Sequence, residues 1–456
     1  MRLLLGLLVL LVGSPLSAQY RAGVARVKIT PQTPVWLSGF AARTRPAEAV
    51  AQDLWAKVLA IEDASGSLFV LVTADIIGFT REITDEIALR AAGKYKLQRR
   101  QILFNASHTH SGPSIWPRLH VAPSTGPEVD QQIRAYAERL VNDIDAAVGR
   151  ALSGMQPAHL TFAEARANFA SNRRIEQLAS LQPGKTFPAP VDQSVPVLRV
   201  ATEDAKTLAI VFGYACHNTV LTSEFNDVSG DYAGHAQVAI EANASGATAM
   251  FVSLCAGDQR PTPRGKRELA EQHGKTVAGA VASALQGRAQ PITGAIHTAY
   301  HVTAIPFQVH TRETFVAESK SADPFLARRG RIALEALDAK RPITETPFAA
   351  QAVRFGSGRA WVALAGEVVI DYQLRLKAEF GADRVVVLGY SNDVMGYIPS
   401  KRVQREGGYE AGDALMYFSQ PGWFTEEVED IVTSAARKVL AEVGLRPAQK
   451  PQTTAR

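Results

Sequence analysis

The stretch Asn105-Ala-Ser-His-Thr-His-Ser-Gly-Pro113 places two histidines two positions apart, directly after the apolar run 101–104. Because successive side chains of a strand point to opposite faces, His108 and His110 are expected to share one face at the end of a strand. The closing Gly-Pro pair turns the chain. Such a pair can combine a metal ligand with a group that transfers protons. An H-x-H pair alone is equally consistent with an ordinary strand surface.

Composition limits the classes of protein that the chain can belong to. It has 456 residues, of which 46% are hydrophobic, enough for one large globular unit or two smaller ones. No linker rich in Pro, Gly or Ser divides it, so we predict one domain over residues 19–446, followed by a polar tail at 447–456. The net charge is +5, but the basic residues are spread along the chain. That spread argues against a nucleic-acid partner.

Residues 1–18 have the features of a secretory signal peptide. Arg2 provides the positive start, residues 3–12 the apolar centre, and Leu16-Ser-Ala18 a cleavage site of mostly small residues. The apolar centre is shorter than the roughly 20 residues that a transmembrane helix needs, and no other run approaches that length. We therefore predict an exported protein, periplasmic or secreted, without a transmembrane span.

Short apolar runs alternate with amphipathic stretches, a pattern typical of an α/β fold with layered mixed β-sheets and flanking helices. Residues 127–153 carry apolar side chains at three- and four-residue spacing, with Pro127 at the start and Gly154 beyond the end, which predicts a helix. A final helix is expected after a cap at Thr425. Expected strands are 23–30, 55–61, 68–75, 207–212, 250–254, 360–364 and 384–388.

Polar side chains follow four of these later strands. They are found in the segments Cys216-His-Asn-Thr219, Cys255-Ala-Gly-Asp258, Gly366-Glu367 and Gly389–Tyr397. Two histidines and a carboxylate with one open position form a common catalytic zinc site. The two cysteines lack C-x-x-C spacing, which excludes a cysteine metal cluster. A disulfide between them and two buried thiols both remain open.

Taken together, these motifs resemble the neutral/alkaline ceramidases, zinc-dependent amidases that hydrolyse N-acyl sphingosine, over about residues 23–444. The landmarks are Ile29-Thr-Pro31, Val72-Thr-Ala-Asp75, Ser107-His-Thr-His-Ser-Gly-Pro113, Asn172-Arg173, Cys216-His217, Gly230-Asp-Tyr232, Cys255-Ala-Gly-Asp258, Gly366-Glu367 and Gly396-Tyr397. The resemblance implies Zn²⁺ ligands at His108, His217, Glu367 and Tyr397. It also implies catalytic or oxyanion-contacting roles for His110, Arg173 and Tyr409. The sequence does not include the immunoglobulin-like C-terminal domain of full-length ceramidases.

One departure from the family concerns the substrate. The ceramidases have a serine in a Gly-Asp-x-Ser-Pro loop, whereas Gly257-Asp-Gln-Arg-Pro261 places Arg260 there. A guanidinium suits a carboxylate, sulfate or phosphate. We therefore predict that Asp258 and Arg260 bind substrate, and that the substrate is an anionic N-acyl compound or an acidic lipid.

The predicted reaction is cleavage of an amide bond by metal-activated water, with His110 transferring the proton. A hydrolase of the same fold acting on an ester, lactone or phosphoester is an alternative, and so is a non-catalytic metal-containing binding protein. His110 and Arg173 argue against the binding protein, which needs no proton shuttle. The expected partner is a small-molecule or lipid substrate, and transient contact with a membrane surface is compatible with it. No G-x-S-x-G or G-x-x-x-x-G-K-[ST] motif occurs.

Overall fold

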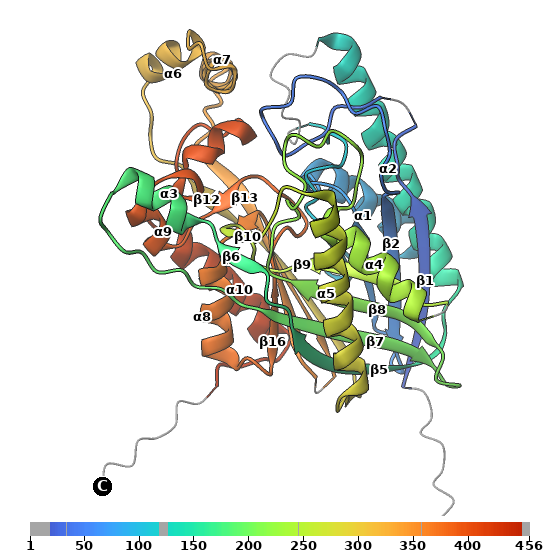
Figure 1. Ribbon diagram of the computed structural model, residues 1–456. Helices are drawn as coiled ribbons and strands as arrows, with labels where there is room; N and C mark the ends of the chain where they lie inside the picture. Colours follow the sequence, from blue (N-terminus) through green and yellow to red (C-terminus); the bar gives the residue numbers. More distant parts are fainter. Residues whose placement is uncertain (1–18, 33, 118–125, 245, 357, 449–456) are drawn as a thin grey trace, which may run out of the picture.

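Two β-sheets packed against each other form the centre of the molecule in the computed structural model, which describes residues 19–448 except 33, 118–125, 245 and 357. One hydrophobic cluster joins them, with Leu59, Leu103 and Val211 from the first sheet and Val353 and Val386 from the second. The predicted signal peptide and nearly all of the predicted tail lie outside the described residues. Figure 1 shows the arrangement.

The larger sheet holds nine strands among the described residues, in the order β4-β3-β2-β1-β5-β7-β8-β9, with β11 beside β5. Its pairs β3/β4 and β8/β9 are parallel and the others antiparallel. The strands are β1 (Tyr20–Lys28), β2 (Trp55–Asp63), β3 (Leu68–Ala74), β4 (Ile102–Ala106), β5 (Gln156–Arg166), β7 (Ser194–Thr202), β8 (Thr207–Tyr214), β9 (Thr248–Ser253) and β11 (Gln290–Ile292). Layers cover both faces of β3, β4 and β9, which is why these segments are continuous apolar runs in the sequence.

The second sheet has the order β12-β13-β14-β16 and is also mixed, because β14 and β16 run parallel. Its strands are β12 (Ile296–Pro306), β13 (Glu345–Phe355), β14 (Ala360–Leu364) and β16 (Val385–Leu388). Two short pairs lie beside the main sheets: β6 (Ala170–Asn172) with β10 (Gln259–Pro261), and β15 (Glu367–Val368) with β17 (Tyr397–Ile398).

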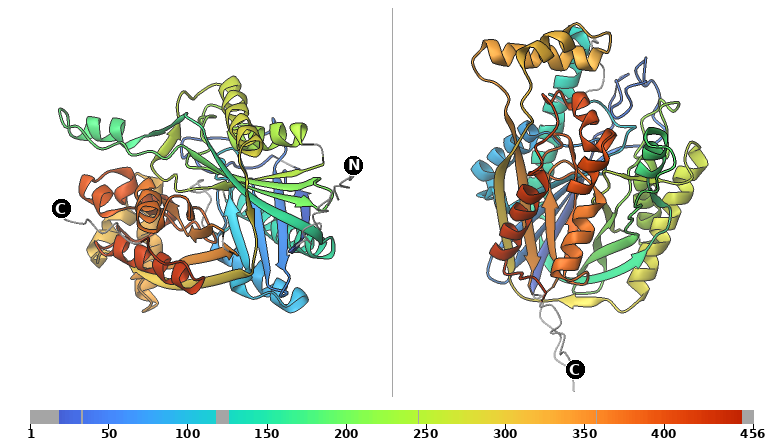
Figure 2. Two further views of the ribbon diagram at one scale, coloured as in Figure 1. Left: turned by 90° about the horizontal axis from the view of Figure 1, so that it is seen from below. Right: turned by 90° about the vertical axis from the view of Figure 1, so that its left-hand side faces the viewer.

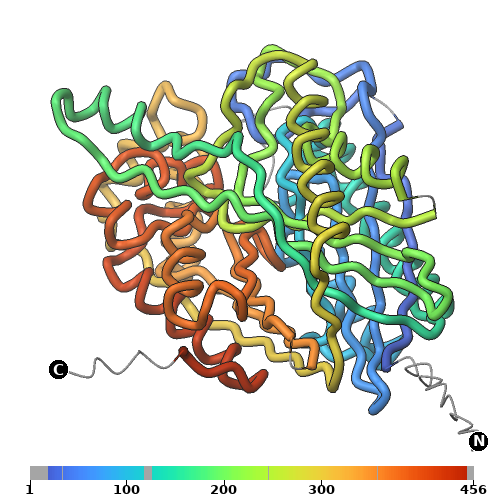
Figure 3. The backbone as a smooth tube through the Cα atoms, turned by 60° about the horizontal axis from the view of Figure 1, so that its bottom comes forward, coloured from blue at the N-terminus to red at the C-terminus, as the bar shows by residue number. Residues whose placement is uncertain are grey.

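Helices cover the outer faces of both sheets, which completes the layers (Figures 1 and 2). On the larger sheet lie α1 (Arg81–Tyr95), α2 (Pro127–Ser153), α4 (Asp231–Asn243) and α5 (Arg267–Gln286). On the second sheet lie α8 (Ile370–Phe380) and α10 (Val428–Glu442). The remaining helices are α3 (Arg174–Leu181), α6 (Arg312–Ser319), α7 (Pro324–Asp338), α9 (Lys401–Glu406) and the 3₁₀ turns η1 (Arg99–Gln101), η2 (Tyr409–Ala411) and η3 (Asp413–Phe418). Figure 3 shows the chain from about residue 290 onward on one side and most of the earlier residues on the other, with the segment that contains α3 reaching across to the carboxyl-terminal side.

Most of the predicted elements are confirmed. The seven predicted strands correspond to β1, β2, β3, β8, β9, β14 and β16, and α2 begins at Pro127 and ends before Gly154. The predicted cap at Thr425 is wrong, because α10 begins at Val428 with Glu427 at its N-cap. For the two cysteines, the sequence left open a disulfide or two buried thiols. In the structure both are free buried thiols.

The feature of the fold that forms the site is the contact between the two edge strands β4 and β9. Asn105 on β4 donates from Nδ2 to the Ser253 carbonyl at 3.3 Å and accepts from the Ser253 N–H at 2.8 Å. A parallel bridge between Thr109 and Asn218 then joins the segments that follow β4 and β8. The loops that carry the histidines therefore lie next to each other although about a hundred residues separate them in sequence.

Candidate metal centre and catalytic site

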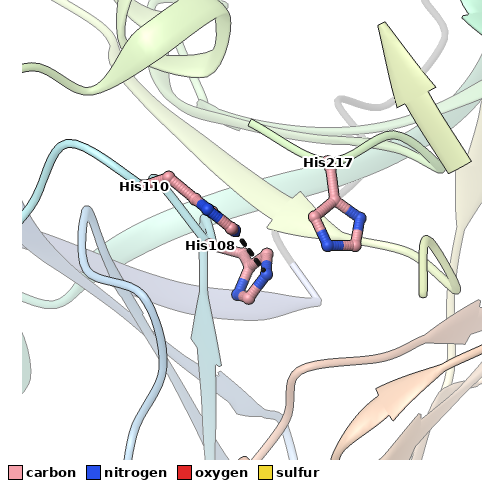
Figure 4. Close-up of side chains that lie close together, drawn as sticks. All are labelled: His108, His110 and His217. Atoms are coloured by element: carbon pink, nitrogen blue, oxygen red, sulfur yellow. Dashed lines mark hydrogen bonds between the residues drawn. The ribbon is translucent and has the colours of Figure 1, made fainter. Parts of the chain in front are cut away.

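The two histidines of the H-x-H pair converge, but not by the alternation of a strand. β4 ends at Ala106, and His108 has a φ of 61°, in the left-handed region. The predicted strand face is therefore wrong at this point. Instead, the loop turns at His108, whose N–H donates to the Ile76 carbonyl at 3.0 Å. His108 Nε2 and His110 Nε2 lie 3.2 Å apart (Figure 4).

His108 and His217 are each held by a backbone carbonyl at Nδ1. The distances are 2.6 Å from His108 Nδ1 to the Ile77 oxygen and 2.7 Å from His217 Nδ1 to the Ala256 oxygen. A carbonyl can only accept a hydrogen bond, so each Nδ1 donates and each Nε2 keeps its lone pair. Metal-binding histidines commonly have this arrangement, which fixes the ring and directs Nε2 toward the ion.

Glu367 lies between these two rings. β15 and β17 run parallel with Glu367 opposite Tyr397, which places both side chains at the site. Glu367 Oε2 is 3.2 Å from His108 Nε2 and 3.2 Å from His217 Nε2. This oxygen is buried and has no hydrogen-bond donor among the described residues. Three lone pairs therefore face one another in a buried space, an arrangement that a cation stabilises.

The spacing of these atoms fits a tetrahedral metal site. Zinc binds His nitrogen and carboxylate oxygen at about 2.0–2.1 Å, so its ligand atoms lie about 3.3–3.4 Å apart. The contacts of 3.2 Å around Glu367 and the 3.4 Å from Tyr397 OH to His217 Nε2 are close to that value. His108, His110 and His217 also lie close enough together to hold an ion. The residues therefore fit a divalent cation with nitrogen and oxygen ligands.

His110 differs from the other two histidines. Its Nδ1 is buried without a hydrogen-bond partner among the described residues, so no carbonyl directs its Nε2 as in His108 and His217. Its ring packs on Phe40 at 4.7 Å between centroids. Burial, with further contributions from His108 and His217, holds the pKa of His110 well below its ordinary value. A neutral, unconstrained imidazole beside two fixed ones is suited to accepting a proton.

The neighbouring groups shift the pKa values of the site residues toward the protonation states that bind a metal. Burial and the nearby Arg173 guanidinium lower the pKa of His217 to about 4. Burial alone would raise the pKa of Glu367, but positive charge beside it, on His108 and His217 or on a cation that they bind, holds the pKa well below the ordinary value. Neutral imidazoles and an ionised carboxylate are the protonation states that metal binding requires.

Arg173, Tyr397 and Tyr409 join the same site. Arg173 follows β6 and donates from Nη2 to Tyr397 OH at 3.0 Å and to the Gly257 carbonyl at 2.9 Å. Its guanidinium lies 5.5 Å from the ring centroids of both Tyr397 and Tyr409. The structure therefore brings together all the residues predicted as metal ligands or catalytic groups: His108, His110, His217, Glu367, Tyr397, Arg173 and Tyr409.

A cavity of about 230 Å³ opens beside the histidines. Its lining is mainly apolar and aromatic: Ser38, Gly39, Phe40, Ala41, Ala42, Ile77, His108, His110, Ser223, Glu367, Val394, Tyr397, Tyr409, Tyr417 and Phe418. The sequence did not single out the 38–42 loop, Val394 or the 417–418 pair. Isolated apolar residues in loops carry no periodic signal, so only their positions in space reveal them.

Asp258 and Arg260, the two residues predicted to bind substrate, do not line the cavity. Asp258 is fully buried, accepting at Oδ1 from the Ile370 N–H (2.9 Å) and at Oδ2 from Asn172 Nδ2 (2.7 Å). Asp258 supports the start of α8 and does not line the cavity. The structure therefore gives it a structural contact in place of the predicted contact with substrate. Arg260 also lies outside the cavity lining, and its guanidinium forms an ion pair with exposed Glu176.

Comparisons with known proteins agree with this fold. The family model for neutral/alkaline non-lysosomal ceramidase, N-terminal, matches residues 20–308. The crystal structure of neutral ceramidase from Pseudomonas aeruginosa superimposes with a TM-score of 0.72 at 18% identity, covering 95% of this chain and 77% of that chain. A structure described as ceramidase complexed with C2 gives 0.72 at 17% identity, with the same coverage. No curated protein sequence matches significantly. Since the family model spans more than half of the sequence, this chain belongs to the neutral/alkaline non-lysosomal ceramidase family.

Proposed function

We propose that this family member is an exported, zinc-dependent hydrolase that cleaves the amide bond of an N-acyl substrate. The observation that carries the proposal is the convergence of His108 Nε2, His217 Nε2 and Glu367 Oε2 at 3.2 Å, next to His110 and an apolar cavity. Family membership supports a hydrolase acting on amide bonds. The metal and the substrate are our inference from the site.

His108, His217 and Glu367 would hold the zinc ion, with Tyr397 as a fourth ligand. Zinc suits this donor set, and when bound it supplies a Lewis acid that activates water near neutral pH. The carbonyls of Ile77 and Ala256 keep both imidazoles in the tautomer that binding needs. The protein therefore holds the ligands before the ion arrives.

The side chains that do not bind the metal transfer the proton and stabilise the oxyanion. His110 takes the proton of the attacking water at Nε2, which faces the other ligand atoms, and returns it to the leaving amine, since its ring is neutral. Tyr409, in the cavity wall, donates a hydrogen bond to the oxyanion of the tetrahedral intermediate, and Arg173, outside the lining, acts on the site through its hydrogen bond to Tyr397 OH. Removing one such donor from a hydrolase costs about 10²–10³ in kcat.

The cavity favours a substrate with an uncharged, apolar part next to the scissile bond. Phe40, Ile77, Val394 and Phe418 form much of its wall, and the described lining contains no lysine or arginine. Arg260, the basis for an anionic substrate, pairs with Glu176 instead. We therefore place an N-acyl lipid ahead of an anionic N-acyl compound.

The test is hydrolysis by the purified protein of a panel of N-acyl lipids, N-acyl amino acids and simple esters, before and after removal of metal. We expect amide cleavage of N-acyl lipids that is lost on treatment with a chelator and restored by zinc. Cleavage of esters alone would support the alternative ester hydrolase. Bound zinc without turnover on any substrate would support the metal-containing binding protein.

Export is inferred from residues 1–18 and is a separate claim. Within the part of the chain that the structure describes, no helix is long and apolar enough to cross a membrane. We expect the mature protein to begin near Gln19 and to be periplasmic or secreted. Mass spectrometry of the protein isolated from each cell fraction would decide it, and an intact Met1 terminus in the cytoplasm would contradict it.

A further inference from the structure

Two consecutive arginines lie against the catalytic site, and one carboxylate joins them. Arg174 and Glu410 are both 0% exposed. Glu410 Oε1 is 2.7 Å from Arg173 Nε, and Glu410 Oε2 is 2.8 Å from Arg174 Nη1. Burial alone would raise the pKa of Glu410, but Arg173 and Arg174 outweigh it and lower the pKa. Glu410 is therefore an ionised carboxylate, and each of its two oxygens accepts a hydrogen bond from one arginine.

The hydrogen bonds of Arg173 define the orientation of its guanidinium. Nε donates to Glu410, and Nη2 donates to the Gly257 carbonyl and to Tyr397 OH. Nη1 has no hydrogen-bond partner among the described residues, and the Arg173 side chain is 14% exposed. The planar guanidinium is thus fixed along one edge, and its remaining edge is free to donate.

We propose that Glu410 is a positioning residue, which fixes the guanidinium of Arg173 against the hydroxyl group of Tyr397 in the cavity wall. This inference rests on the proposed function, since it assigns Glu410 to the same reaction. Neither Glu410 nor Arg173 lines the cavity, so Glu410 acts on the site through the hydrogen bond from Arg173 to Tyr397 OH. Its place directly after Tyr409 in η2 also couples the position of the tyrosine to that of the arginine.

The chemistry requires a carboxylate at position 410. An amide of the same shape has one acceptor oxygen and one NH₂ group, whereas both arginines present only donors. In Glu410→Gln, one arginine would therefore face a donor, and its buried charge would lose its partner. Breaking a buried pair in this way is destabilising. A loss of stability alone would not distinguish positioning from support of the fold.

Glu406 provides a matched control that separates positioning from support of the fold. Glu406 on α9 accepts from Arg174 Nε at 3.2 Å and Nη2 at 3.0 Å, and it also pairs with Arg402. Within the described part of the chain, Glu406 forms no hydrogen bond or ion pair with Arg173. Arg174, at the start of α3, pairs with both Glu406 and Glu410, so both carboxylates support the same region. Glu406→Gln removes comparable support from Arg174 and leaves Arg173 untouched.

The experiment measures kcat, KM, zinc content and Tm for Glu410→Gln and Glu406→Gln. We expect both variants to keep zinc and to have a lower Tm, but only Glu410→Gln to lose kcat, by about 10-fold or more, with KM nearly unchanged. Equal kcat values for the two variants would overturn the proposal. If Glu410→Gln does not fold, Glu410→Asp withdraws the carboxylate by one methylene while keeping its charge, and it is expected to lose kcat in the same way.

A double-mutant cycle tests whether Glu410 acts through Arg173. In an Arg173→Met background, Glu410→Gln is expected to reduce kcat by less than about 2-fold, because the group that it positions is gone. A further full loss would contradict the proposal. A crystal structure of Glu410→Gln gives a readout without activity: Arg173 should leave Tyr397 OH and the Gly257 carbonyl. If the wild type cleaved no substrate, the proposed function would fail, and this structure would still decide the role of Glu410.

Discussion

The ring of His110 lies directly against Gly39. A β-carbon built on Gly39 would be 2.3 Å from His110 Cγ and 2.3 Å from His110 Nδ1, closer than atoms can approach without displacement. Gly39 also has a φ of 94°, which a residue with a side chain rarely adopts. The glycine thus leaves room for the imidazole, whose Nδ1 has no hydrogen-bond partner in the part of the chain that the structure describes.

Gly39→Ala is therefore expected to displace His110 and reduce kcat by about 10-fold or more, while zinc content stays at the wild-type level. Gly66→Ala is the matched control. Gly66 has a φ of 83° and nothing within 4 Å of a built β-carbon, so it shares the backbone strain but not the collision. Similar kcat values for the two variants would mean that His110 does not depend on the space at Gly39.

Alanine substitutions separate the metal ligands from the proton-transfer group. His108→Ala, His217→Ala and Glu367→Ala are each expected to lose bound zinc, because each removes one of the converging donor atoms. His110→Ala is expected to retain zinc and lose turnover by about 10²-fold or more. Metal analysis combined with rate measurement checks both outcomes. Loss of zinc from His110→Ala to the same extent would make His110 a ligand, as the three-histidine group permits.

Arg260→Ala tests the substrate class. Because the Arg260 guanidinium pairs with Glu176 and lies outside the cavity lining, we expect KM for neutral and for anionic N-acyl substrates to change by less than about 2-fold. Glu176→Gln, which frees the guanidinium, is the companion variant. A rise in KM of about 10-fold for anionic substrates alone would restore the prediction made from the sequence.

Asp192 predicts a specific dependence of stability on pH. Burial opposes its ionisation, but the Lys377 ammonium at 2.6 Å and Gln373 outweigh burial and lower its pKa to about 2. A carboxyl group with a depressed pKa in the folded state stabilises the protein fully above the unfolded pKa of about 4. That contribution is lost as the pH falls from about 4 through 2.

Asp192→Asn is thus expected to lower the free energy of unfolding by about 2 kcal/mol at pH 7, with the difference from wild type shrinking below pH 4. Urea unfolding at several pH values measures this difference. Asp383→Asn, at an exposed site, is the control and should remain within about 0.5 kcal/mol of wild type. A difference for Asp192→Asn that did not change with pH would show that packing, and not charge, is responsible.

Most of the helices and strands, and the chemical groups of the site, could be predicted from the amino-acid sequence. The apolar runs at β3, β8 and β14 are recognisable because strands buried between layers are apolar along their whole length. The helix α2 is recognisable from its periodic stripe, its proline and the glycine after its end. The resemblance of the ordered motifs then identified the residues that meet at the site.

How those groups meet, and which residues surround them, depends on the folding of distant segments against one another. His108 reaches the site through a left-handed turn, Glu367 and Tyr397 through the pairing of two short strands, and Arg173 through a carboxylate more than two hundred residues away. Asp258 and Arg260 have the residue types of a binding site, but one supports a helix and the other pairs with Glu176. The physical reason is that periodicity and propensity reflect local backbone geometry, whereas these contacts depend on which distant surfaces pack together.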